Sequence, residues 1–154
     1  MAMLLGIAGL IPFVVCSLGA LTELPPNNER SLLALTAYGA VTLSFLGGVH
    51  WGFGLDATGA PPADIQRARF VLGVLPGLIG WVALLVTFLG YPRTGLVVLI
   101  IGYMLTTVME ARASRLGWMP KGYMGLRWVL SVVVIVLLVS VWLVLTLGGR
   151  VVLW

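Results

Sequence analysis

The residues of this sequence that could do chemistry are few, and one of them lies inside a long apolar run. His50, the single histidine, stands next to Trp51 and among four glycines in the stretch SFLGGVHWGFG, residues 44–54. A histidine titrates near neutral pH, and ionisable residues within apolar segments commonly have a role. His50 is therefore a candidate titratable or ligand-binding group. The alternative is structural: a His–Trp pair that anchors a helix at a membrane interface, or a neutral imidazole bonded to a backbone carbonyl.

Three further charged residues are expected near His50 once the apolar runs fold as helices. Glu110 ends the fourth run, Arg69 lies at the start of the third, and Arg127 lies at the start of the fifth. A rim of such charges could bind a lipid phosphate or a quinone head group, or pass protons. In a simpler alternative, the Glu110 carboxylate at the helix end only pairs with Arg112, Arg115 or Arg69. The candidate polar or ligand site thus consists of His50, Trp51, Glu110, Arg69 and Arg127.

Several other chemistries find no support in the sequence. The single cysteine, Cys16, excludes an intrachain disulfide, a CxxC redox pair and a multi-cysteine metal site. One histidine likewise excludes a haem held by two histidines of this chain. The sequence contains no GxGxxG, Walker, HExxH or GxSxG motif. We therefore expect a protein without catalytic activity, without a metal site and without a cofactor.

The composition indicates a membrane protein. Of the 154 residues, 60% are apolar and 9% are charged, and the mean hydropathy is +1.11. Because about a quarter of a soluble protein is charged, this chain needs lipid as its solvent. The formal net charge of +4 then favours contact with membrane lipids, including anionic ones, over nucleic acid. The first apolar run lacks the basic start and cleavage site of a signal peptide, so we expect a retained helix in a bacterial inner membrane.

Five apolar runs are long enough to cross a bilayer as helices. They lie near residues 3–24, 32–55, 68–90, 94–110 and 127–148, and the fourth is short. Linkers rich in proline, glycine and asparagine separate them. The sequence therefore predicts an all-α integral membrane bundle of five transmembrane helices, which forms a single domain over residues 1–154.

Basic residues predict how the bundle is oriented, because they are more frequent in cytoplasmic loops. Six lie around the linkers between spans two and three and between spans four and five, and three lie on the opposite side. The six are Arg67, Arg69, Arg112, Arg115, Lys121 and Arg127, and the three are Arg30, Arg93 and Arg150. We expect the N-terminus in the cytoplasm and the C-terminus outside.

Small residues recur every four positions in the second apolar run and so form a stripe along one side of a helix. Small residues in such a stripe let a neighbouring helix come close, which favours helix association in lipid. We expect a helix-packing interface here, with the second run at the centre of the bundle; hinges or a glycine-lined ligand cleft are the alternatives. The members of this packing set are Ala40, Ser44, Gly48 and Gly52 in the second run and Gly73 and Gly77 in the third.

The run YGAVTLSFLGGVHWGF, residues 38–53, is the most distinctive part of the chain. GLIPFV precedes it in the first run and VLPGLIGW follows it in the third. With these segments the chain resembles a family of small bacterial multi-pass membrane proteins, domain of unknown function 3429, which has mitochondrial relatives. The resemblance covers about residues 5–144 and implies a five-helix integral membrane protein. It implies no established activity, and no catalytic residue is carried over from it.

Two functions from different classes fit the sequence. The first is a non-enzymatic accessory or assembly subunit that packs against a larger energy-transducing membrane complex or against itself. The second is a small oligomeric transporter or channel in which His50 and Glu110 are proton-linked groups. A membrane enzyme that acts on lipid or quinone ranks third, because it would need more polar residues than the sequence contains.

Overall fold

A computed structural model describes residues 2–22, 27–55, 63–115 and 123–148, which form six α-helices and no strand. The helices are α1 (Ala2–Ala8), α2 (Ile11–Thr22), α3 (Asn27–Leu55), α4 (Ala63–Phe88), α5 (Pro92–Arg115) and α6 (Tyr123–Leu147). The helices α1 and α2 together form the first of five segments that are long and apolar enough to cross a membrane. The prediction of an all-α protein with five spans is confirmed.

Several helices extend beyond the predicted spans, and the largest difference is in the fourth. This span was predicted as a short run over 94–110, but α5 continues from Pro92 to Arg115. Similarly, α3 begins at Asn27 instead of residue 32, and α4 begins at Ala63 instead of residue 68. Hydropathy marks only the segment that lies in hydrocarbon, whereas Glu, Arg and Ala are good helix formers that continue the helix into the polar layer. Glu110 is therefore inside α5 and not at its end.

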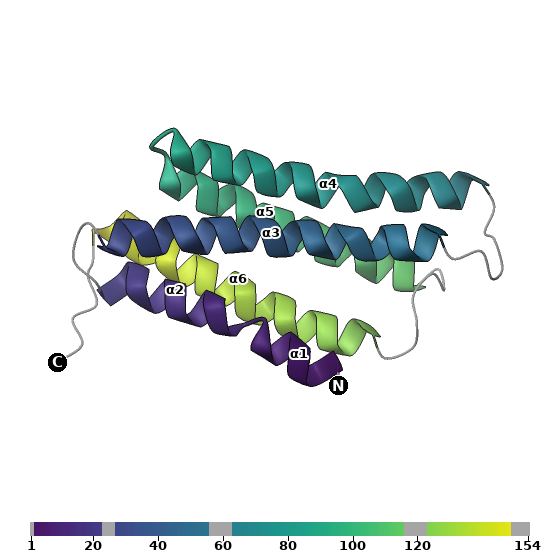
Figure 1. Cartoon of the computed structure of the whole chain (residues 1–154), viewed down its shortest axis with the longest axis horizontal. Coiled ribbons are helices and arrows are strands. Elements are labelled where there is room, and N and C mark those ends of the chain that lie inside the picture. Colours follow the sequence, from purple (N-terminus) through teal and green to yellow (C-terminus); the bar gives the residue numbers. More distant parts are fainter. Residues whose placement is uncertain (1, 23–26, 56–62, 116–122, 149–154) are drawn as a thin grey trace.

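The helices alternate in direction, with α3 and α5 between the others (Figure 1). The helix α3 contacts α2, α4 and α5, and α5 contacts α3, α4 and α6. The predicted central position of the second span is therefore shared with the fourth. The start of α1 and the end of α6 lie toward opposite ends of the bundle, as five crossings require (Figure 1). Which end faces the cytoplasm stays a prediction.

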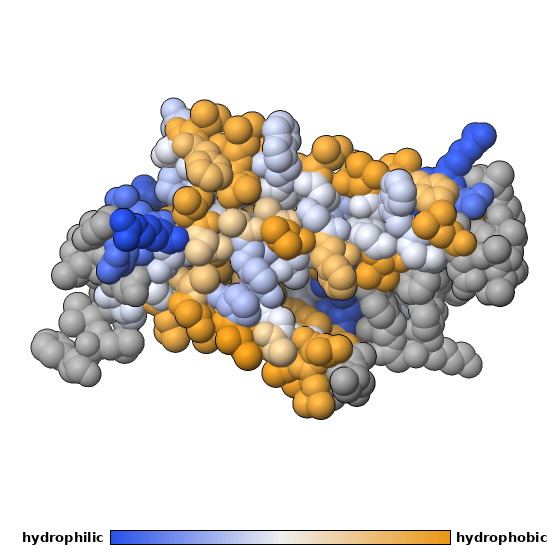
Figure 2. Space-filling model, in the orientation of Figure 1, coloured by the Kyte–Doolittle hydropathy of each residue, from blue (hydrophilic) through white to orange (hydrophobic). Residues whose placement is uncertain are grey.

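The polar and apolar surfaces are arranged as a membrane protein requires. Figure 2 shows hydrophilic residues gathered at the two ends of the bundle and apolar residues over much of the surface between them. The ends of α4, α5 and α6 that carry most of the arginines lie together, away from Arg30 and Arg93 (Figure 1). Lys121 and Arg150, which also entered the count for orientation, lie outside the described residues.

The first span is interrupted between α1 and α2, because Pro12 has no N–H to continue the hydrogen-bond ladder. At this break the Gly9 carbonyl accepts a hydrogen bond of 3.0 Å from the Tyr38 hydroxyl of α3. The Phe13 ring packs edge-to-face against Tyr38 and Tyr103, with ring centroids 5.0 and 6.3 Å apart. Tyr103 in turn donates to the Gly39 carbonyl at 3.0 Å. These aromatic contacts join α2, α3 and α5 in the bundle core.

The helices α3 and α4 cross at backbone contact. A Cβ atom added at Gly80 would lie 2.8 Å from the Ala40 carbonyl oxygen, and one added at Gly77 would lie 3.5 Å from Ser44 Oγ. The next step of the contact is Gly47 against Gly73, where an added Cβ would overlap the facing backbone. Only small residues fit at these positions. Four members of the predicted packing set, Ala40, Ser44, Gly73 and Gly77, lie along this contact.

The other half of the predicted stripe does not take part in this contact. A Cβ added at Gly48 or Gly52 would meet no atom within 4 Å. A spacing of four residues turns about 40° further around the helix at every step, since one turn contains 3.6 residues. Residues spaced exactly four apart therefore turn gradually away from a straight helix–helix interface. The contact between α3 and α4 continues instead at Gly47 and Trp51. Gly48 and Gly52 lie on an open face of α3.

A tight connection joins α4 to α5 and fixes these helices as neighbours. Gly90 has a φ of 91°, which favours glycine, and the backbone closes as the N–H of Tyr91 bonds to the Val86 carbonyl at 3.1 Å. Pro92 then begins α5, a position where its missing N–H leaves no hydrogen bond unmade. The connection GYPR, residues 90–93, is thus a helix C-cap followed at once by a helix start.

The neighbouring glycines Gly47 and Gly48 provide a test of the α3–α4 contact. We expect Gly47→Ala to destabilise the purified protein by about 1–3 kcal/mol, because the added methyl group overlaps the α4 backbone. We expect Gly48→Ala to change stability by less than about 1 kcal/mol, because its methyl group meets open space. Thermal unfolding in the same detergent compares the two variants, and equal effects would contradict the observed register.

Candidate functional site

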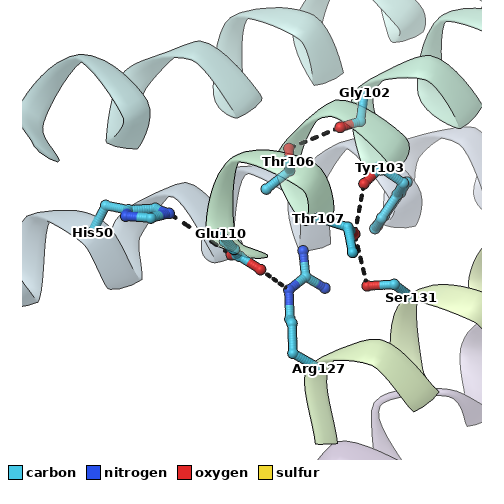
Figure 3. A network of polar contacts seen from close by, with 8 residues as sticks. All are labelled: His50, Gly102, Tyr103, Thr106, Thr107, Glu110, Arg127 and Ser131. Carbon is cyan, nitrogen blue, oxygen red and sulfur yellow. Dashed lines mark hydrogen bonds and ion pairs between the residues drawn. The ribbon is translucent and has the colours of Figure 1, made fainter. Parts of the chain in front are cut away.

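Three ionisable side chains meet in the interior of the bundle, and each comes from a different helix. His50 on α3, Glu110 on α5 and Arg127 on α6 are 2%, 0% and 4% exposed. Figure 3 shows the His50 ring pointing from α3 toward the Glu110 carboxylate, and the Arg127 guanidinium reaching the same carboxylate from α6. The predicted rim therefore contains a compact group, here named the charge cluster, made of these three residues.

The helices place these three side chains at one level because they alternate in direction. His50 lies in the last two turns of α3, Glu110 in the second half of α5, and Arg127 in the second turn of α6. The end of α3, the end of α5 and the start of α6 lie at the same end of the bundle (Figure 1). Residues far apart in sequence thus meet in space.

The Glu110 carboxylate is the common partner in the charge cluster. Arg127 Nε donates a hydrogen bond to Glu110 Oε2, and the two side chains form a buried ion pair. His50 Nε2 lies 3.8 Å from Glu110 Oε1, which is too long for a hydrogen bond but close enough for an ion pair when the imidazole is protonated. Each carboxylate oxygen therefore faces a different basic side chain.

Two polar atoms of the charge cluster are not used. Among the described residues, neither Glu110 Oε1 nor Arg127 Nη2 has a hydrogen-bond partner, although both are buried. The pair binds through Nε alone and does not use the two-pronged geometry that an arginine and a carboxylate commonly adopt. A buried polar atom without a partner costs about 1–3 kcal/mol. Both atoms can therefore form a further hydrogen bond: Glu110 Oε1 with a water or another donor, and Arg127 Nη2 with a water or a ligand that accepts.

Arg69 takes part at a longer distance. It lies on α4, is half-buried, and acts on His50 through its charge, as Arg127 also does. Four helices, α3, α4, α5 and α6, thus supply ionisable residues at this end of the bundle. Glu110 pairs with Arg127 of α6, which is not one of the three arginines named in the simpler alternative.

A polar ladder continues from the charge cluster along α5 and α6. Thr107 and Ser131, one turn further into the bundle, share a hydrogen bond of 3.0 Å, and the Thr107 hydroxyl also donates to the Tyr103 carbonyl at 2.8 Å (Figure 3). Sequence reasoning did not select these residues. The sequence signal that could have identified them is spacing. Thr107 and Glu110 are three residues apart and Arg127 and Ser131 are four apart, so each pair lies on one side of its helix.

Trp51, the remaining residue of the predicted polar site, does not join the charge cluster. Its indole Nε1 donates to the Phe70 carbonyl of α4 at 3.2 Å, and its ring packs edge-to-face on the Phe70 ring. Neighbouring residues of a helix point about 100° apart, so His50 faces α5 while Trp51 faces α4. Trp51 therefore fixes the α3–α4 contact at its end and contributes no group to the cluster.

The chemistry available to the cluster is limited to charge, hydrogen bonds and protons. Among the described residues, no three histidine, cysteine, aspartate or glutamate side chains lie close enough together to hold a metal ion. Cys16 is free and packs against the apolar core. The cluster can bind a hydrogen-bond acceptor at Arg127 or a hydrogen-bond donor at Glu110. It can also move a proton between His50 and Glu110.

Comparison with known proteins places the chain among multi-pass membrane proteins. It matches the family described as "Protein of unknown function (DUF3429)" over residues 1–143. Transmembrane protein 69 of Xenopus tropicalis is 35% identical to it over 139 residues, which are 90% of this chain and 52% of that protein. Transmembrane protein 69 of Mus musculus is 36% identical over 103 residues, which are 66% of this chain and 39% of that protein.

The chain thus spans about half the length, or less, of these curated relatives. No solved structure matches it. The family match covers nearly all of the described helices and includes His50 and the glycines around it. The resemblance read from residues 38–53 is therefore confirmed, and the chain belongs to the DUF3429 family of multi-pass membrane proteins related to transmembrane protein 69.

Proposed function

We propose that the protein is a non-enzymatic subunit of the bacterial inner membrane, which packs against a larger membrane complex, such as an energy-transducing one, through the open face of α3. The observation that carries this proposal is the empty space beside Gly48 and Gly52. Both glycines lie on a surface that also contains the exposed side chains of Val41 and Phe45. A flat glycine surface next to a large apolar side chain favours the docking of another transmembrane helix.

The use of glycine elsewhere in the bundle supports this proposal. Five glycines of α4 and α5 would each bring an added Cβ within 4 Å of a neighbouring helix, so glycine occurs where helices touch. They are Gly73, Gly77, Gly80, Gly95 and Gly102. Glycine weakens a helix relative to alanine by about 1 kcal/mol. Glycines that touch no other helix therefore destabilise α3 without a compensating contact inside this chain. A helix of another protein on Gly48 and Gly52 would account for them.

A leucine at position 48 tests the proposed docking. We expect Gly48→Leu to retain the thermal stability of the purified protein, because the side chain enters open space, and to abolish co-purification with a larger complex after gentle detergent extraction. Gly125→Leu is the matched control on α6, where an added Cβ also meets no atom within 4 Å. This control should retain both properties.

Two results would contradict the docking proposal. One is a protein that extracts as a monomer while native membrane complexes remain intact in its absence. The other is a homodimer that is lost in Gly48→Leu, because the open face would then bind a second copy of this chain.

A second function is favoured by the distance between His50 and Glu110. We infer that a small oligomeric transporter or channel could move protons through this pair, since His50 Nε2 lies 3.8 Å from a carboxylate oxygen that has no hydrogen-bond partner among the described residues. Ionisable residues within transmembrane helices commonly mark ion or proton paths. A small movement of either side chain would bring the two atoms within hydrogen-bond distance.

Flux in reconstituted liposomes tests this second function. We expect a proton-linked flux that falls about tenfold or more in His50→Ala and in Glu110→Gln, because both variants remove a proton-carrying group. Trp51→Phe is the control, since Trp51 neighbours His50 in sequence but faces α4. An absence of flux under any common ion or proton gradient would contradict the transport function, and docking would be the one proposed function left.

A further inference from the structure

We propose that the protein binds an anionic lipid in a cavity between α1, α3 and α6, with one acyl chain inside and the anionic head group on Arg127. This site does not depend on the proposed docking function, because it rests on a cavity and on Arg127, although two lining residues, Val41 and Phe45, also border the open face of α3. The head group is a phosphate or a carboxylate, so the lipid is a phospholipid or a fatty acid. Both kinds of lipid have an acyl chain connected to a group with negatively charged oxygen atoms.

The cavity has the size and lining that an acyl chain requires. Its volume is about 340 Å³, near the lower end of small-molecule pockets, so it accommodates a single chain and not a whole two-chain lipid. The lining is almost entirely apolar and includes Leu5, Leu10, Phe13, Phe45, Leu130 and Val134. The cavity exists because α1 bends away from α2 at the break before Pro12, which separates α1 from α3 (Figure 1).

The cavity is open to the surrounding lipid. Two of its lining residues, Val41 on α3 and Leu5 on α1, are each 65% exposed and lie at its mouth. Figure 2 shows a recess between α3 and α1 with hydrophilic atoms at its base, in a part of the surface that is otherwise largely apolar. A lipid in the bilayer could therefore enter sideways, and its second chain would remain in the bilayer.

Arg127 supplies the donor for the head group. It lines the cavity, is 4% exposed, and its Nη2 has no partner among the described residues. The three hydroxyl groups in the same lining already donate to backbone carbonyls: Tyr38 to Gly9, Tyr103 to Gly39, and Thr42 to Tyr38. The cavity thus offers an uncommitted N–H at Arg127, and its occupant has to bring an acceptor oxygen.

The Arg127 guanidinium favours an anionic acceptor over a neutral one, because its Nη2, which has no partner among the described residues, belongs to a cation. A charge-assisted hydrogen bond from Arg127 would hold it.

The direction of the cavity matches that of a lipid in one leaflet. Arg127 lies in the second turn of α6, near the polar end of the bundle, whereas Val134 lies about 10 Å further along the helix toward the centre. Phe13, Tyr38 and Tyr103 close the cavity at this inner end. A head group at Arg127 would therefore lie at the membrane interface with its acyl chain pointing inward, as in the bilayer itself.

Native mass spectrometry of the full chain in mild detergent tests the proposal. Dioleoylphosphatidylglycerol should bind one molecule per protein, about tenfold or more tightly than dioleoylglycerol, which has the same chains but no phosphate, because one charge-assisted hydrogen bond gives a preference of this size. Oleate tests the fatty acid as a source, and binding of either anionic amphiphile supports the site. Inorganic phosphate, which has no chain, should not bind; if it alone binds, the acyl-chain site is overturned.

Two variants connect binding to this cavity. Val41→Trp should fill the mouth and abolish binding, whereas Val129→Trp should bind like the unchanged protein. The pair is matched, since Val41 is 65% and Val129 is 62% exposed, and Val129 does not line the cavity. Equal binding by both variants would overturn the proposal.

A third variant tests the head group without leaving an unpaired charge. Glu110→Gln/Arg127→Gln retains two side chains that can hydrogen-bond but removes the guanidinium, so it should bind dioleoylphosphatidylglycerol and dioleoylglycerol alike. Thermal unfolding checks that this variant is folded. A retained preference for phosphatidylglycerol, or tight binding of a neutral short-chain quinone in place of both anionic amphiphiles, would overturn the assignment of an anionic lipid.

Discussion

The ion pair between Glu110 and Arg127 is the interaction on which the polar interior of this bundle depends. An isolated charge at the centre of a transmembrane helix costs about 2.5–3.5 kcal/mol on insertion scales, and two unpaired charges would oppose the packing of α5 on α6. Direct contact removes much of that cost and fixes the register of the two helices. The hydrogen bond between Thr107 and Ser131 continues the same register one turn further.

The position of α3 determines which group meets this pair. On one side, small residues bring α3 into backbone contact with α4; on the other, Tyr103 of α5 donates to the Gly39 carbonyl. Because α3 is held from both sides, its rotation is fixed, and His50 points to Glu110 while Trp51 points to α4. The glycines that pack α3 thus also orient the histidine. Packing and polar chemistry are consequences of one helix position.

The two proposals meet on α3, where Val41 and Phe45 border both the open face and the cavity. The open face at Gly48 and Gly52 looks outward from α3, where a partner helix would cover it. Arg127 Nε donates a hydrogen bond to Glu110 inside the bundle, and Arg127 Nη2 is left to bind a ligand in the cavity. A subunit that retains a lipid beside its charged interior would carry that lipid to the interface with its partner. The broken first span makes this possible, because its bend separates α1 from α3.

The sequence by itself determined the class of protein, the five spans and the residue types of the polar site. Length and hydropathy are local properties, and apolar runs near 20 residues have few folds available in lipid. Helix ends were less well predicted, because charged residues such as Glu110, Arg112 and Arg115 continue a helix that hydropathy ends. The predicted stripe follows the α3–α4 contact at Ala40 and Ser44 and leaves it at Gly48, because a spacing of four departs from 3.6 residues per turn.

Only the tertiary structure decided which of these residues meet. His50, Glu110 and Arg127 are 60 and 17 residues apart along the chain, and nothing local specifies their distances. Their contact depends on helix rotation and register, which the glycine contacts of α3 and the hydroxyl ladder of α5 and α6 set together. The cavity at Arg127 depends further on the angle between α1 and α2. Such quantities arise from the packing of whole helices, so a linear pattern could name the participants but not their arrangement.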